Sequence, residues 1–249
     1  MTQGVLLFCF DTAEVQYHRI TNRCVDQIDR YLQLPITVVT NQNTLDQWND
    51  RPDVNFVIID NQTGNRRGSS EWHNLDRCEA YQISPYDTTL LMDTDYLCYT
   101  SNLLEYMKSK DDFLIHRDVY DLTGKNVYDF RTNSLIPMLW ATVIVFRKTP
   151  RAKYIFDTVR YIKQHYQYFC KLYRVDFANF RNDYAFSMAM NQIDGFNQQY
   201  FIPARLPTLP TTARVRSFHE HGLTFEVDGR LGNIEHQDVH VLDKEIVNV

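Results

Sequence analysis

Short apolar runs alternate with amphipathic stretches along the first 100 residues of the chain. Four runs have the length and composition of strands that are buried on both faces, namely residues 4–10, 36–39, 55–59 and 89–92. After the first run, apolar residues recur at three- and four-residue steps through Ile20, Cys24 and Ile28, which predicts a helix with one buried face. Asp11 and Thr12 are expected to cap this helix. The alternation predicts an α/β fold with a mixed, mostly parallel sheet flanked by helices.

The later part of the chain continues this alternation. Further strands are predicted at residues 113–115 and 139–146, and helices at residues 74–83, 102–107, 155–169 and 183–193. Polar composition predicts loops at residues 61–73 and 116–136, and prolines predict an extended last fifth. No repeat or linker is present, so we expect one domain over residues 1–249, with halves 1–100 and 101–200 and a C-terminal segment 201–249.

Composition narrows the class of protein. The net charge of −5 makes no case for nucleic-acid binding by the protein as a whole. The five cysteines have no metal-site spacing, and their odd number predicts free thiols in a reducing compartment. Neither a signal-peptide pattern nor an apolar stretch long enough to span a membrane is present, so the sequence predicts a cytoplasmic protein without a membrane span.

Two acidic residues follow the apolar run at 89–92 directly. Asp93 and Asp95 stand at i and i+2, so in extended chain their carboxylates lie on one side, about 7 Å apart. A bend would bring them closer, and one divalent cation could then bind both. Ligands of open α/β sheets commonly bind at this end of a strand. The alternative is a solvated turn, because Asp also favours turns and caps nearby amides.

Other parts of the sequence bear on phosphate and metal binding. No G-x-G-x-x-G or G-x-x-x-x-G-K-[ST] motif follows a predicted strand, so the usual phosphate cradles are absent from the sequence. Arg66 lies in a glycine-containing polar loop that either contacts phosphate or is merely solvated. The histidines after residue 218 do not match a zinc motif, but a single distant histidine would complete a metal site with Asp93 and Asp95.

Residues 75–77 and 84–95 carry a family resemblance. An arginine-bearing helix, a Pro-Tyr-Asp turn, an apolar strand and the D-x-D pair follow one another, which resembles GT-A (Rossmann-like) glycosyltransferases of family 8, the glycogenin and galactinol-synthase type. The resemblance implies that Asp93 and Asp95 bind Mn²⁺ or Mg²⁺ on the diphosphate of a nucleotide-sugar. It also implies that Phe10 and Asp11 border the nucleoside, and that Arg77 approaches the donor's phosphate or sugar.

The resemblance extends to two later segments, with departures. Asn182 and Asp183 stand where the family has Asp-Gln, which implies a place near the anomeric carbon. The family's H-x-x-G-x-x-K-P-W motif has a counterpart near the end of the chain, without its Gly and Pro-Trp. In that counterpart His240 is the implied third metal ligand, and His236 is the alternative to it. Lys244 is the residue implied to neutralise phosphate. Ala141-Thr142-Val143 replaces the family's Asn-Ala-Gly, so the acceptor contacts are not carried over.

The resemblance implies an enzyme. It would transfer a hexosyl or pentosyl group from a nucleoside-diphosphate sugar to an acceptor hydroxyl, with retention of configuration. The acceptor is left open between a sugar, a protein, a lipid and a modified nucleic-acid base. Two alternatives stay open: a nucleotidyltransferase acting on a sugar phosphate, although residues 11–14 are not its usual glycine- and basic-rich loop, and a non-catalytic binding protein with a degenerate GT-A fold.

Overall fold

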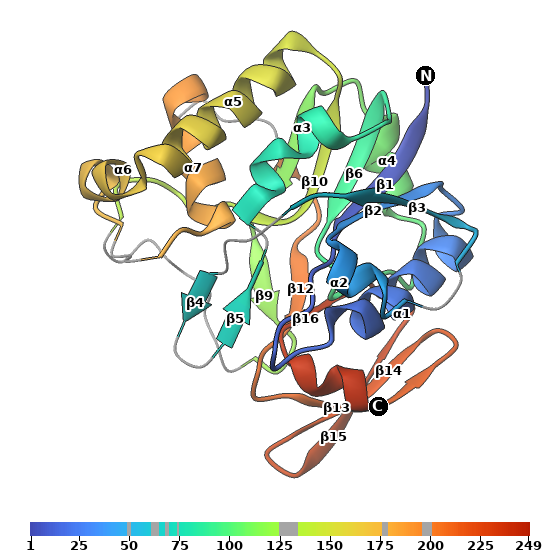
Figure 1. Ribbon diagram of the computed structural model, residues 1–249. Coiled ribbons are helices and arrows are strands. Elements are labelled where there is room, and N and C mark those ends of the chain that lie inside the picture. The colour runs from blue at the N-terminus through green and yellow to red at the C-terminus, as the bar shows by residue number, and fades with distance from the viewer. Residues whose placement is uncertain are drawn as a thin grey trace.

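A seven-stranded mixed sheet forms the centre of the molecule in the computed structural model, which describes residues 1–48, 51–60, 65–67, 70–73, 75–124, 134–175, 179–195 and 201–249 (Figure 1). The strand order is β11-β8-β10-β6-β1-β2-β3. The bounds are β1 Gln3–Phe8, β2 Ile36–Thr40, β3 Val54–Ile58, β6 Thr88–Met92, β8 Phe113–His116, β10 Trp140–Arg147 and β11 Phe201–Ile202. Strands β1, β2, β3 and β6 are mutually parallel, as predicted. Strand β10 runs antiparallel to both β6 and β8.

Both faces of this sheet are buried, which explains the continuous apolar runs. In β1, Val5 and Leu7 face one apolar cluster while Leu6 and Phe8 face the other, since side chains alternate along a strand. Helices α1 (Tyr17–Tyr31) and α4 (Leu103–Lys108) cover the first face. The second face is covered by the following helices: α3 (Ala80–Ile83), α5 (Pro150–Gln164), α6 (Tyr166–Tyr173) and α7 (Asn182–Asp194).

Smaller sheets bring the C-terminal part of the chain back to the end of β6. One has the order β7-β16-β12-β9, with β7 Tyr96–Leu97, β9 Val119–Asp121, β12 Leu206–Leu209 and β16 Val239–Val241. In it, β16 pairs with β7, directly after Asp93 and Asp95. The remaining strands form the meander β13 (Arg214–His219), β14 (Gly222–Val227) and β15 (Arg230–Glu235), low in Figure 1. The 3₁₀ helix η3 (Lys244–Asn248) follows.

Several local predictions differ from the structure. The segment predicted as a loop at 61–73 includes a hairpin of β4 (Asn65–Arg67) and β5 (Ser70–Trp72), and residues 119–121 form β9. The helix predicted over 74–83 is the 3₁₀ turn η1 (Leu75–Glu79) followed by α3. The last fifth of the chain was predicted only to be extended, and in the structure it contains the three-stranded meander β13-β14-β15. Part of the predicted loop at 116–136, residues 125–133, lies outside the described residues. The short helix α2 (Gln42–Leu45) was not predicted.

The first helix begins later than predicted. Helix α1 starts at Tyr17, because the Thr12 hydroxyl accepts the backbone N–H of Val15, 3.0 Å away, and holds a turn before the helix. Asp11 still accepts the backbone N–H of His18 in the first helical turn at 2.8 Å, so it caps the helix from a distance. None of the described helices has both the length and the apolar character needed to cross a bilayer. All five cysteines are buried and free.

Candidate active site

A pocket lies where the carboxyl end of β6 meets the amino end of β10. Its lining includes eight of the eleven residues that the sequence singled out: Phe10, Arg77, Asp93, Asp95, Asn182, Asp183, His240 and Lys244. Antiparallel pairing produces this juxtaposition, because Val143 stands opposite Met92 and Asp93 donates its N–H to the carbonyl of Thr142 at 2.8 Å. Residues 141 and 142 of β10 therefore lie beside the D-x-D segment.

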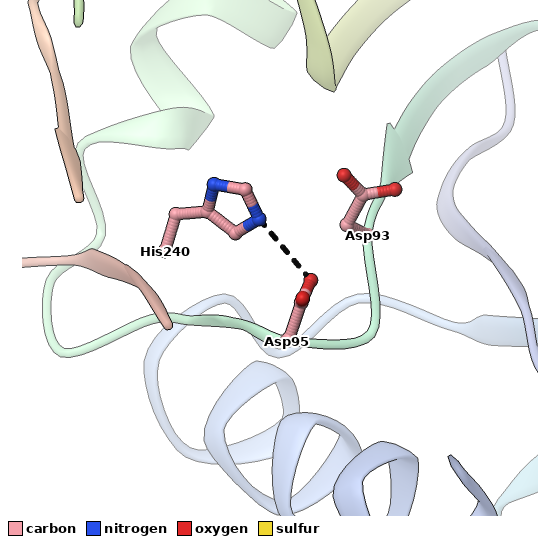
Figure 2. Close-up of side chains that lie close together, drawn as sticks. All are labelled: Asp93, Asp95 and His240. Atoms are coloured by element: carbon pink, nitrogen blue, oxygen red, sulfur yellow. Dashed lines mark ion pairs between the residues drawn. The ribbon is translucent and has the colours of Figure 1, made fainter. Parts of the chain in front are cut away.

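Asp93, Asp95 and His240 converge within the pocket. Each offers one ligand atom, and these atoms lie within 4.8 Å of one another (Figure 2). The Nε2 atom of His240 is 3.4 Å from Oδ1 of Asp95. Asp95 and His240 are buried, whereas Asp93 is half-buried. Two carboxylate oxygens and one imidazole nitrogen suit Mn²⁺, and Mg²⁺ also accepts an oxygen-rich set, so this donor set fits the ion that the fold suggests.

A backbone turn brings the two carboxylates together. Tyr96 donates its N–H to the Asp93 carbonyl at 3.2 Å, which bends the chain at Thr94. Val241 donates its N–H to the Asp95 carbonyl at 2.9 Å and so anchors strand β16 beside the turn. The neighbouring His240 then faces the carboxylates. The bend predicted from sequence is thus a turn fastened by a strand from the far end of the chain.

Each aspartate also has a cationic partner. Arg77 pairs with Asp93 and donates to the carbonyl of Thr142 at 3.2 Å, and Lys244 pairs with Asp95. Burial lowers the pKa of Arg77 to about 10, against the opposing effect of Asp183 and Asp95, so the guanidinium stays charged at neutral pH. Two carboxylates and two cations therefore face one another.

The pKa values of Asp95 and Lys244 shift in opposite directions. Burial by itself would raise the pKa of Asp95, but the interactions of its carboxylate with Lys244 and His240 outweigh burial and hold the pKa well below its usual range. Burial by itself would lower the pKa of Lys244, but the attraction of the Asp95 carboxylate outweighs burial, and the pKa is raised. Both groups are ionised at neutral pH.

Helix α7 contributes the opposite wall of the pocket. It begins at Asn182, which is buried, and Asp183 stands in its first turn. One carboxylate oxygen of Asp183 accepts the N–H of Ala141 at 2.8 Å, and the other accepts from Arg181 at 3.2 Å. Asp183 therefore has the structural role expected of a first-turn acid and also lines the pocket.

Two other predicted residues lie elsewhere. Asp11 is next to Phe10, but its carboxylate is held by His18, with Oδ2 2.5 Å from Nδ1, and it is not part of the lining. His236 stacks on His221 in the meander, with ring centroids 4.8 Å apart, so of the two candidate histidines only His240 lies beside the aspartates. The side chain of Arg66 lies outside the described residues.

The lining residues that were not predicted from sequence include Tyr17, His73, Trp140 and Arg181. Tyr17, the first residue of α1, packs against the apolar core and also lines the pocket. Trp140, the first residue of β10, likewise belongs to the core and to the lining. Arg181 immediately precedes Asn182, which is the one signal that could have drawn attention to it.

Asp238 connects the turn after the D-x-D segment to the strand that carries His240. Its buried carboxylate accepts the N–H groups of Tyr99 and Thr100, at 2.7 and 2.8 Å, and the Thr100 hydroxyl at 3.0 Å. The Tyr96 hydroxyl adds a longer contact of 3.4 Å. Burial raises the pKa of this carboxyl, while the N–H donors oppose the shift. Asp238 therefore holds the two halves of the candidate metal site in place.

Replacing Asp238 is expected to destabilise the protein. Asp238→Ala would leave three buried donors without an acceptor, and we expect the free energy of unfolding to fall by about 3 kcal/mol. Urea denaturation followed by circular dichroism measures this loss. Asp118→Ala is the matched control, since Asp118 is exposed and its side chain pairs with the exposed Arg117. Equal losses in the two variants would contradict this role of Asp238.

Comparison with known proteins identifies the fold. No family model matches this sequence, and the search of curated proteins gives no match. Among solved structures, an active-site mutant of LgtC aligns over 80% of this chain and 71% of its own, with 11% identity and a TM-score of 0.52. The apo glycosyltransferase GlyE of Streptococcus pneumoniae TIGR4 aligns over 81% of this chain, with 12% identity and a TM-score of 0.45, and this chain spans only 45% of GlyE. Apo mouse xyloside xylosyltransferase 1 aligns over 78% of this chain and 82% of its own, with 12% identity and a TM-score of 0.47. The LgtC match confirms the predicted fold class, the GT-A glycosyltransferase fold.

Proposed function

We propose that this protein is a metal-dependent glycosyltransferase that moves a hexosyl or pentosyl group from a nucleoside-diphosphate sugar to an acceptor hydroxyl. The observation that carries the proposal is the convergence of Asp93, Asp95 and His240 with Arg77 and Lys244 in one pocket. A leaving diphosphate needs positive charge, and ligands for a cation together with two fixed cationic side chains meet that need. The GT-A fold and the segment 75–95, which resembles family 8, support this chemistry.

Each group in the pocket has a role in this proposal. Asp93, Asp95 and His240 would hold a Mn²⁺ or Mg²⁺ ion, and the bound ion would supply charge neutralisation at the diphosphate. Lys244 and Arg77 would donate to phosphate oxygens. Phe10 and the neighbouring Asp11 would border the nucleoside, on the wall that Phe8 and Tyr17 also line, and Arg66 would reach the phosphates from the segment after β3.

Retention of configuration is the stereochemical outcome we propose. Inversion requires a base for the acceptor hydroxyl. The pocket lining has three carboxylates among the described residues: Asp93 and Asp95 are the proposed ligands, and Asp183 is engaged by Ala141 and Arg181. Front-face attack within the donor complex needs no such base. Asn182 and Asp183 would then position the anomeric carbon and the acceptor, whose class we leave open.

A thermal-shift screen tests the proposed donor site. We expect one nucleoside diphosphate, with Mn²⁺ present, to stabilise the protein by about 2.7 kcal/mol at a hundredfold excess over its Kd. Lys244→Gln should weaken that Kd about tenfold, because one charge-assisted contact is lost. Lys108→Gln, on the exposed face of α4, should leave it unchanged.

The screen also separates the alternatives. If a well-folded sample shows no shift with any nucleotide, the donor site is contradicted and the degenerate-fold alternative is favoured. If nucleoside triphosphates and sugar phosphates give the shifts and nucleotide-sugars give none, the nucleotidyltransferase alternative is favoured.

A further inference from the structure

Large apolar side chains are exposed along α5 and α6. Tyr154, Tyr161 and Tyr168 recur at seven-residue steps and are between 55% and 63% exposed, and Leu172 is 48% exposed. Seven residues are close to two helical turns, so Tyr154 and Tyr161 share one side of α5, while Tyr168 lies in α6. The opposite side of α5, with Ile155, Phe156, Val159 and Ile162, is fully buried in the core.

These side chains form one continuous patch. Tyr161 and Tyr168 both contact the buried ring of Phe169, with centroid distances of 5.9 and 5.3 Å, so the patch continues across the junction of the two helices. Leu135 is also exposed and lies beside the last residue of α6, since its N–H donates to the Tyr173 carbonyl at 2.9 Å. We call Leu135, Tyr154, Tyr161, Tyr168 and Leu172 the tyrosine face. Nine large apolar side chains are exposed among the described residues, and these five are the majority.

The charge of this region opposes that of the rest of the protein. Residues 150–174 contain six basic residues and one acidic residue, whereas the chain has 26 basic and 31 acidic residues in total. Some of the basic side chains are paired inward, since Arg160 pairs with Glu79, Lys163 with Asp76 and Arg151 with Asp194. Lys153 pairs with Asp157 on the helix surface. Lys171 and Arg174, next to Leu172, have no ion pair with any described carboxylate.

We propose that the tyrosine face docks the protein on an anionic membrane surface. Tyrosine and long basic side chains together suit the headgroup region, where the ring enters the interface and the ammonium or guanidinium group remains among the phosphates. A protein partner fits less well, because the cores of protein interfaces are depleted of lysine, and this patch is bordered by Lys153 and Lys171. Of the 30 acidic residues outside residues 150–174, Asp76, Glu79 and Asp194 are paired with this region. The remaining acidic residues would be repelled by the same surface, which would orient the molecule with this side down.

Vesicle co-sedimentation of the full chain tests the proposal. The probes are phosphatidylcholine vesicles with and without 30% phosphatidylglycerol, about the anionic content at which surface charge attracts basic segments. We expect binding to the anionic vesicles to exceed binding to the neutral ones at least tenfold, and to fall as salt is raised. Lys171→Glu with Arg174→Glu should reduce that binding at least tenfold, as should Tyr154→Ser with Tyr161→Ser and Tyr168→Ser.

Controls separate surface chemistry from folding. Leu231→Ser changes an exposed apolar residue on the meander, and Lys108→Glu reverses a charge on α4; both should bind as wild type. Tyr154 makes no ring contact with any described residue and is 60% exposed, so Tyr154→Ser alone reports on the patch even if the triple variant is poorly folded. Equal binding to both vesicles, or none, would overturn the proposal. A dimer seen by analytical ultracentrifugation and lost in the tyrosine variants would also overturn it, because a second copy would then cover the face.

Discussion

Asp95→Asn is expected to lower the rate of sugar transfer at least about a hundredfold, the scale for losing one preorganised group that stabilises developing charge. Asp95 is the most highly connected member of the candidate metal group: His240 and Lys244 both face its carboxylate, and Val241 fastens its backbone. An amide keeps the shape but removes the negative charge. A divalent ion would then be held by one carboxylate and one imidazole.

The measurement is the initial rate of nucleoside-diphosphate release from the donor that the thermal-shift screen identifies, over a series of Mn²⁺ concentrations. The apparent affinity for Mn²⁺ should weaken together with the rate. Asp29→Asn makes the same chemical change on the exposed side of α1 and should behave as wild type. A wild-type rate and Mn²⁺ dependence in Asp95→Asn would contradict the assignment of the metal site.

The second large effect concerns stability. Arg77 is 2% exposed and its guanidinium is held by Asp93 and the Thr142 carbonyl, so removing either charge leaves the other without its partner. We expect Arg77→Met and Asp93→Asn each to lower the free energy of unfolding by about 3–5 kcal/mol. The double variant should lose less than the sum, by about 1–3 kcal/mol, since the second change removes a charge that is already unpaired.

Urea denaturation in EDTA measures this cycle without interference from metal ions. The exposed pair Lys108 and Glu105 provides the matched cycle, because both its members are largely solvated and an exposed pair contributes about 0–1 kcal/mol. Additive losses at Arg77 and Asp93 would show that the pair does not act as a unit. A double variant that is also inactive would be consistent with the proposed donor site but would not test the coupling.

Local patterns in the sequence predicted most of the sheet. Runs such as residues 4–10 and 89–92 are apolar at successive positions because each strand is buried on both faces, so burial alone marks them. The D-x-D pair was equally visible, because both carboxylates follow a single strand. Helix starts were less visible: α1 begins at Tyr17 because of a turn at Thr12 and a carboxylate contact from Asp11 that spacing does not specify.

The residues from distant segments that the structure brings beside the aspartates, Arg77, His240 and Lys244, were named in advance only through the family resemblance. The periodicity of the sequence could not distinguish His236 from His240 as the metal ligand, because the two differ in their neighbours in the folded protein and not in the local sequence pattern. Strand β16 pairs with β7 and β12 and carries His240 to the aspartates, while the meander holds His236 away from them. The pairing of Asp183 with Ala141 likewise depends on the packing of α7 against β10.

The sequence by itself therefore determined most of the buried strands and long helices, and where one pair of carboxylates ends a strand. These features depend on the chemistry of neighbouring residues, which a short window of sequence contains. Only the tertiary structure decided that β10 runs antiparallel beside β6, that Arg77 and Lys244 each face an aspartate, and that three tyrosines remain at the surface. Such contacts join residues far apart in the chain, and the packing of the whole core selects among the many pairings that local pattern permits.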